Sequence, residues 1–538
     1  MRQALIRRLG ALVLALGLLG ALAVPHAAAA SITANTLADV AANDGHCTLR
    51  EAITAANTDT VSGASAGECA AGSGTDTITF SVAGTITLTS DLPDITTDMS
   101  IVGANAITVS GASSFRAFNI GGATATVSGI TVTDGAGDVG GAISNDGGTV
   151  TLANSTLHAN TATGEGGAIF NEGTLIITNS NITGNSAPVG GGISNSAGII
   201  TISNSTIGSN SAGIAIGGGI NNTTGTITVI GSTLGSNAAG TAGGGISNGS
   251  GTIIVANSTI GSNTAGTVGG GINNTIGVIT ISNSTIGANA AGTTGGGLNT
   301  AGNATIVNAV ISNNTAPVGL NINTIGGGTT ITNSVIGGGI LVPGGLANNG
   351  GPTQTIALAL VAGNPAIDTG LASVCAASPI NSLDQRGLPR PAACDIGAYE
   401  AQPPTISPHA NVSVAVSPPA PTAVTYTPPT GTDEQGGVAA VACLPASGST
   451  FAVGTTTVTC TATDAVGHTA TGSFLVIVNA VAAPSPPAPS LPNAATASGM
   501  NGAPGGEATA GVLLLLLALL SLSGLVVLAR SRGRDGIR

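Results

Sequence analysis

Carboxylates near the start of the central region are the first candidates for chemistry. Asp134, Asp138, Asp146, Glu165 and Glu172 follow one another there. Carboxylates gathered along one edge of a fold can bind calcium. Neither the spacing of a DxDxDG loop nor that of a GGxGxDx repeat is present, so we favour a solvated acidic patch over a calcium site.

Charged pairs further along the chain form a second candidate site. Asp384 stands two residues before Arg386, and Asp395 precedes Glu400. Such pairs can carry out acid–base chemistry. We favour structural pairing, because this block follows the end of a repeat array and should close it.

Three acidic residues near the C-terminal side are the remaining candidates. Asp433, Glu434 and Asp464 could bind an ion, but turn and solubilising roles are favoured. We therefore assign no catalytic, cofactor-binding or metal-binding residue and expect no cofactor.

The segment CTLREAITAAN, from Cys47, predicts a helix. Thr48 as N-cap and Glu51 three residues later form a capping box. Its apolar face is formed by Leu49, Ala52, Ile53 and Ala56. A catalytic role for Arg50 and Glu51 is the alternative, but capping and a surface pair explain both residues. An amphipathic helix ahead of a stack of strands would cover its open end.

The strands and turns that would position these side chains are expected from a repeat over residues 140–340. A GGAISN-like phrase recurs at spacings of 24 to 27 residues, and an NSTI-like phrase follows each time. The phrases start at Gly140, Gly166, Gly190, Gly217, Gly243, Gly269 and Gly295. Alternating Thr, Ile and Val between the phrases predicts short strands, and Gly and Asn predict corners. This predicts an all-β solenoid.

Stacking explains the composition of the array. Coiling places each residue about 4.8 Å above its counterpart, where like charges repel. From Gly173 to Ile367, 195 residues carry no Asp, Glu, Lys, Arg or His. We expect the asparagines that close the repeats to stack their amides as a ladder. These asparagines are Asn160, Asn185, Asn210, Asn263, Asn289 and Asn314. Stacking in the turns also explains sequons such as the one at Asn154 without attached sugar.

Four resemblances follow from these motifs. The GGAI and [IL]-x-x-N phrases resemble the repeats of right-handed parallel β-helix surface proteins, including polymorphic outer-membrane proteins. CTLREAI resembles the CSLREAI motif that precedes such regions. Residues 346–401, with DQRGLPRP and CDIGAYE, resemble the choice-of-anchor domain that follows them. FAVGTTTVTCTATDAVGHTATGSFLVIV resembles a HYR (hyalin repeat) domain, which implies an immunoglobulin-like sandwich.

The expected organisation follows the chain. Residues 1–30 form a signal peptide, 31–75 the CSLREAI-type cap, 76–345 the β-helix with 25–27-residue rungs, and 346–401 the closing block. Residues 402–479 form the HYR domain, 480–510 a Pro/Ala/Gly-rich linker, 511–529 a transmembrane helix and 530–538 a basic cytoplasmic tail. Six cysteines lie as neighbours in three modules, which favours the pairs Cys47–Cys69, Cys375–Cys394 and Cys443–Cys460.

The net charge of the chain narrows the range of expected binding partners. The net charge is −12 and the chain has no lysine, so nucleic acid is not an expected partner. We expect an exported protein anchored at the cell surface by its C-terminal membrane helix, or transferred to the envelope after processing. Its partner would be an extracellular surface, a polysaccharide or a protein.

Two classes of function remain. The first is a non-enzymatic adhesin or structural protein of the cell envelope. The alternative is a polysaccharide lyase or hydrolase, since such enzymes share the β-helix fold. The array lacks paired carboxylates, and Phe170 is its only aromatic residue, which weighs against an enzyme. A Thr-rich face that orders water or ice is a third hypothesis, although the threonines form no strict TxT ladder.

Overall fold

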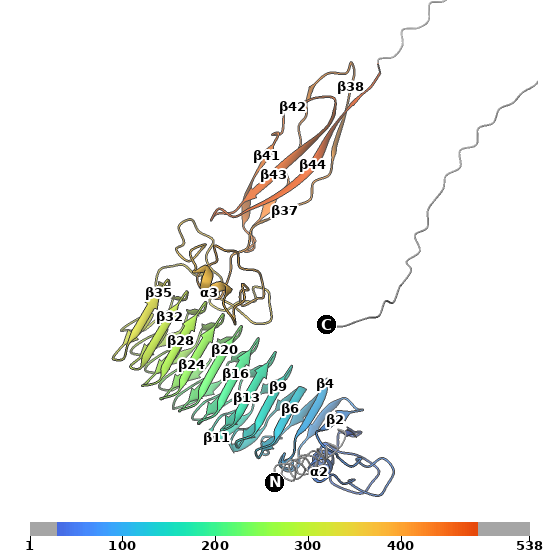
Figure 1. The fold of residues 1–538 in the computed structure, drawn as a ribbon, viewed down its shortest axis with the longest axis vertical. Coiled ribbons are helices and arrows are strands. Elements are labelled where there is room, and N and C mark those ends of the chain that lie inside the picture. The colour runs from blue at the N-terminus through green and yellow to red at the C-terminus, as the bar shows by residue number, and fades with distance from the viewer. Residues whose placement is uncertain (1–29, 483–538) are drawn as a thin grey trace, which may run out of the picture. The chain divides into compact units, whose positions relative to one another are not determined.

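The computed structural model describes residues 30–482 (Figure 1). The predicted signal peptide, apart from residue 30, lies outside this range. The predicted linker, apart from residues 480–482, and the predicted membrane helix and basic tail also lie outside it. No helix within residues 30–482 is long and apolar enough to cross a membrane. The predicted span at residues 511–529 is thus outside the described part of the chain.

Residues 31–336 form a parallel β-solenoid, as predicted. Its largest sheet comprises β1 (Ser31–Ala34), β2 (Asp76–Phe80), β3 (Gly84–Thr87), β4 (Met99–Ser110), β6 (Thr124–Thr133), β9 (Thr149–Ala153), β10 (Thr156–His158), β13 (Thr174–Thr178), β14 (Asn181–Thr183), β16 (Ile199–Ser203), β17 (Thr206–Gly208), β20 (Thr226–Ile230), β21 (Thr233–Gly235), β24 (Thr252–Ala256), β25 (Thr259–Gly261), β28 (Val278–Ser282), β29 (Thr285–Gly287), β32 (Asn303–Val307), β33 (Val310–Ser312), β35 (Thr329–Thr332) and β36 (Val335–Ile336). β1 pairs with β2, so the sheet starts inside the region expected to be the cap.

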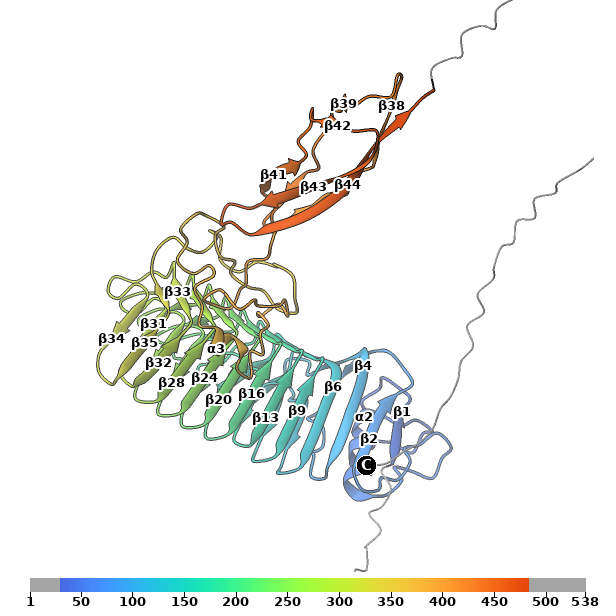
Figure 2. The same cartoon turned by 45° about the horizontal axis from the view of Figure 1, so that its top comes forward.

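The GGAISN-like phrases form a second sheet. It comprises β5 (Phe118–Ile120), β8 (Ile143–Asn145), β12 (Ile169–Asn171), β15 (Ile193–Asn195), β19 (Ile220–Asn222), β23 (Ile246–Asn248), β27 (Ile272–Asn274), β31 (Leu298–Thr300) and β34 (Ile322–Thr324). Short strands line the third side, namely β7 (Ala136–Val139), β11 (Thr161–Glu165), β18 (Ser211–Ala212), β22 (Ala238–Ala239), β26 (Thr264–Ala265) and β30 (Ala290–Ala291). The middle turns of the solenoid, such as those with β18, β22, β26 and β30, therefore contribute strands to three sides, and the parallel stacking of the turns is seen in Figure 2.

Strict register makes the core a set of ladders. Ile227, Ile253 and Ile279 pair in successive rungs and are fully buried.

Glycine is needed where rungs approach most closely. A Cβ on Gly244 would lie 2.4 Å from the carbonyl oxygens of Gly270 and Thr264. The repeated glycines thus set the tight stacking of one rung on the next.

Asparagine ladders run through the interior, as predicted. The amide Nδ2 of Asn210 donates to Oδ1 of Asn237 at 3.0 Å, and Asn237 donates likewise to Asn263 at 2.9 Å. The full ladder is Asn160, Asn185, Asn210, Asn237, Asn263, Asn289 and Asn314. A second ladder, not predicted, runs through Asn145, Asn171, Asn195, Asn222, Asn248 and Asn274. Both satisfy backbone groups at buried corners.

The N-terminal helix is α2 (Leu49–Thr58), and its predicted capping box is present. Its apolar side chains, such as Leu49 and Ile53, are fully buried in the same core cluster as Ile32 and Ile78 of the first strands. The helix therefore covers the bore of the solenoid at this end.

The block at residues 346–401 contains α3 (Ala372–Ala376) and has its own core around Leu358 and Tyr399. The expectation that it closes the last rung is wrong. Its hydrogen bonds reach back along the side of the solenoid, from Gln385 to Ser232 and from Arg390 to Asn257. The reason is a set of buried polar side chains on this side that need partners from the block.

The C-terminal module forms two sheets. A six-stranded sheet contains β37 (Thr405–Ile406), β38 (Val412–Val416), β40 (Gly431–Thr432), β41 (Val438–Leu444), β43 (Gly454–Thr463) and β44 (Thr469–Ala480), and a two-stranded sheet contains β39 (Thr422–Ala423) and β42 (Thr450–Phe451). Val458, Cys460 and Ala462 alternate along β43 and are fully buried, so they form its inner face.

Candidate functional surfaces

The carboxylates of the first coils form local hydrogen bonds. The acceptor and donor pairs are Asp134 with Thr133, Asp138 with Thr163, Asp146 with Ser144, and Glu165 with Ser194. Glu172 is exposed. In the described residues, no group of three or more His, Cys, Asp or Glu side chains could hold a metal ion. Asp134 lines a hollow of about 320 Å³, but its neighbours there are glycines and neutral side chains.

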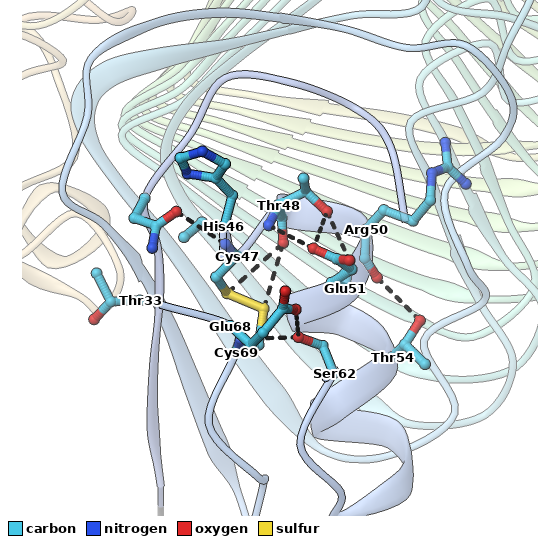
Figure 3. The surroundings of a disulfide bond; sticks show 12 residues. Thr33, His46, Cys47, Thr48, Arg50, Glu51, Thr54, Ser62, Glu68 and Cys69 are labelled. Atoms are coloured by element: carbon cyan, nitrogen blue, oxygen red, sulfur yellow. Dashed lines mark hydrogen bonds between the residues drawn. A yellow bond between two sulfur atoms is a disulfide. The ribbon is translucent and has the colours of Figure 1, made fainter. Parts of the chain in front are cut away.

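The charged residues of α2 support the cap (Figure 3). Arg50 forms a salt bridge to Asp39 at 2.8 Å, and it also donates to the carbonyl of Ser90. One carboxylate oxygen of Glu51 accepts the backbone N–H of Thr48, and the other accepts that of Ala42. The predicted capping role of Glu51 is confirmed. Arg50 forms a charged pair, but the pair does not lie at the surface as expected, because the side chain of Asp39 is fully buried.

The charged pairs of residues 346–401 form a buried cluster. Arg386 Nε lies 2.8 Å from Asp384 Oδ2, and Arg390 Nη1 lies 2.9 Å from Glu400 Oε2. The two oxygens of Asp395 accept backbone N–H groups of Asp368 and Ala401 at 2.7 Å. All five charged side chains of the cluster are less than a tenth exposed. The predicted structural pairing of Asp384 with Arg386 is confirmed, and Arg390 is a member that the sequence analysis missed.

Burial changes the pKa values of two acidic side chains in this cluster. Burial raises the pKa of Glu400 to about 8 and that of Asp395 to about 6, because the charged forms lose solvation. Arg390 opposes both shifts. The two carboxyls therefore hold protons more tightly in the folded block than in the unfolded chain.

Gln385 is one of several residues that attach the block to the solenoid. Gln385 Nε2 donates to Ser232 O at 3.1 Å and to Thr233 Oγ1 at 2.9 Å, while its Oε1 accepts from Thr259 Oγ1 at 2.6 Å. Gln385 itself is only 2% exposed. Its role could not be found from the sequence, because its partners lie more than 120 residues earlier.

The acidic residues of the C-terminal module have structural roles. Asp433 accepts the backbone N–H groups of Gln435 and Gly437, and Asp464 accepts that of Val466, so both stabilise turns as predicted. Glu434 instead pairs with Arg386 at 3.3 Å.

The three predicted disulfides, Cys47–Cys69, Cys375–Cys394 and Cys443–Cys460, are all present. One bond lies in each module, which fits folding in an oxidising compartment.

The outer face of the largest sheet is the most extended candidate contact surface. Its central column is neutral, and ten of its twelve members carry a hydroxyl. In rung order, the column is Ser31, Thr77, Ser100, Thr126, Thr151, Ile176, Thr201, Thr228, Ile254, Thr280, Thr305 and Thr330. All twelve are half-buried or exposed. The column was missed because its regularity depends on register across rungs of unequal length.

Comparison with known families identifies the C-terminal module. Residues 399–478 match the HYR domain family. The chain has no match among the curated proteins or the solved structures compared. The protein is thus an all-β chain in which a parallel β-solenoid precedes a HYR domain. This domain type and the three disulfides indicate an extracellular surface protein. The resemblances of residues 47–57 and 346–401 to CSLREAI and choice-of-anchor segments stay predictions.

Proposed function

We propose that the protein is a non-enzymatic adhesin of the cell surface, in which the solenoid presents a long neutral face and the HYR domain forms an immunoglobulin-like module. The observation that carries this proposal is the HYR domain at residues 399–478, which follows a solenoid whose coils from Gly173 onward carry no charged residue. The acids that most resembled a catalytic set are buried and engaged with arginines or backbone N–H groups.

The proposed binding surface is the central column of the largest sheet. Its hydroxyls recur about every 4.8 Å and can donate and accept hydrogen bonds along an extended partner. The face carries no charge, so it offers no attraction to nucleic acid or to anionic polymers. A neutral, hydroxyl-rich polysaccharide at a cell or environmental surface is the partner that this chemistry fits.

The test measures binding and turnover together. The purified chain is applied to an array of neutral, acidic and basic glycans, and released reducing ends or unsaturated sugars are followed in the same wells. We expect retention on neutral glycans with no new product. Turnover of any glycan would overturn the proposal in favour of a lyase or hydrolase.

A charge substitution locates the surface. Thr228→Arg with Thr280→Arg places two cations on the column, and we expect retention to fall at least tenfold. Ser250→Arg is the control, because Ser250 is exposed in a turn between β23 and β24. Equal loss in both variants would show that the column is not the binding surface.

A further inference from the structure

The last coil of the solenoid has an unpaired edge. Its strands β34, β35 and β36 pair on one side with β31, β32 and β33 of the coil before. Among residues 30–482, no strand pairs with their other side. β34 and β35 lie outermost in the stack, whereas α2 covers the first coil (Figure 2). The two ends of the solenoid therefore differ.

The ladders of buried core side chains become exposed to solvent at this edge. Ile306 is fully buried, whereas its partner Ile331 in the last coil is 45% exposed. Ile311 and Ile336 show the same change, from 0% to 39%. Val318, Leu320 and Ile325 of the same coil are each more than half exposed. The bore thus ends in a contiguous apolar surface, and such surfaces mark interaction sites.

Leu320 replaces a glycine of the repeat. The pairing of Leu298 with Ile322 aligns Leu320 with Gly296 of the coil before. A Cβ on Gly296 would lie 2.4 Å from the carbonyl oxygen of Leu320. A side chain at this position therefore prevents another coil of the same kind from stacking in parallel above it. The sequence ends the array here and excludes continued head-to-tail stacking.

The edge also lacks the usual protection. Natural edge strands often carry charge or proline, which prevents pairing with another chain. β34, β35 and β36 contain neither, and no charged residue occurs from Gly173 to Ile367. Two such edges can approach each other without electrostatic repulsion.

We propose that this end binds the same end of a second copy, with the edges paired antiparallel about a twofold axis. A single extended peptide could pair with one edge strand, whereas a second copy offers all three edges and continues the core. A rung of about 25 residues at about 3.3 Å each has a perimeter of roughly 80 Å, which encloses at most about 500 Å². Two such ends bury about 1,000 Å², the lower limit for a specific interface. The dimer should therefore depend on concentration, and α2 at the far ends stops further growth.

The test compares matched variants of the full chain by sedimentation velocity over a concentration series. Leu320→Lys with Val318→Lys changes two exposed residues of the last coil. Ile214→Lys with Ile276→Lys is the control, because these residues are 83% and 71% exposed in earlier coils. We expect dimers of the parent and the control, and at least a tenfold weaker association of the last-coil variant. Circular dichroism verifies that all three fold.

Amide hydrogen exchange gives an independent readout. Exchange of β35 in the parent should slow as the concentration rises, while that of β9 should not change. A parent that is monomeric at all concentrations overturns the proposal. The proposal is also overturned if both variants still associate, or if both lose association. In either case a surface other than the last coil would mediate the association. Concentration-independent protection of β35 would also overturn it, because another segment of the same chain would then cover the edge.

Discussion

Replacing Asn237 by alanine tests whether the amide ladder holds the rungs together. Asn237 is fully buried, and its Nδ2 donates to Asn263 Oδ1 and to Ile207 O, both at 2.9 Å. Its Oδ1 accepts the backbone N–H and one side-chain N–H of Asn210, both at 3.0 Å. The substitution leaves these two N–H groups without a partner and removes one donor from the Ile207 carbonyl, so three groups are affected.

The expected loss follows from those three groups. Each buried unsatisfied group costs about 1–3 kcal/mol, and water entering the truncated site offsets part of this cost. We therefore expect the free energy of local unfolding to fall by about 3–5 kcal/mol. Since neighbouring coils stabilise each other, hydrogen exchange of β21 and β25 is the appropriate assay.

A control decides the interpretation. Asn181→Ala changes an exposed asparagine in the same array, and a surface change of this kind should alter stability by at most about 0.5 kcal/mol. If Asn237→Ala destabilises β21 and β25 by no more than Asn181→Ala does, the ladder does not hold the rungs together.

Three further predictions concern stacking, attachment and titration. Gly244→Ala should destabilise the array by about 1–3 kcal/mol in guanidinium denaturation, because its Cβ meets backbone, whereas Gly213→Ala should be tolerated because nothing lies within 4 Å. Gln385→Ala should speed proteolysis of residues 346–401, whereas Gln402→Ala, which removes one bond to a carbonyl within that block, should not. The pKa of Glu400 is raised from an ordinary value of 4.5 to about 8 in the folded block, so the stability of the block should fall as pH rises from about 4.5 to 8. Glu400→Gln should flatten this pH dependence, which urea denaturation at several pH values measures.

Local and periodic features could be predicted from the sequence. The capping box at Thr48 and Glu51 depends on residues three apart, and the first amide ladder depends on an asparagine that recurs with the repeat. The second ladder had a signal as well, because six of the seven GGAISN-like phrases end in an asparagine that recurs with the same period. Asn195 and Asn222 show why it was missed, since nothing in the phrase distinguishes an inward from an outward asparagine.

Contacts between distant segments could not be predicted. Gln385 and Thr233 are 152 positions apart, and neither lies in a pattern that points to the other. The block was expected at the rung end because it follows the array in the chain. Its attachment to the side depends instead on polar groups that the solenoid brings into one row, and only the register of the rungs shows that row.

Stacking links the fold to its proposed contacts. A charged residue at a repeated position would recur about every 4.8 Å and repel its copies, and residues 173–367 carry no charge. The same exclusion leaves a neutral outer face, which we propose as the binding surface, and a last coil whose edge strands carry no charge that would repel a second copy. Within residues 30–482, the acids are thus confined to the cap, the first coils, residues 346–401 and the HYR domain. The charged residues that favour solubility and the surface proposed for neutral recognition therefore lie in different parts of the chain.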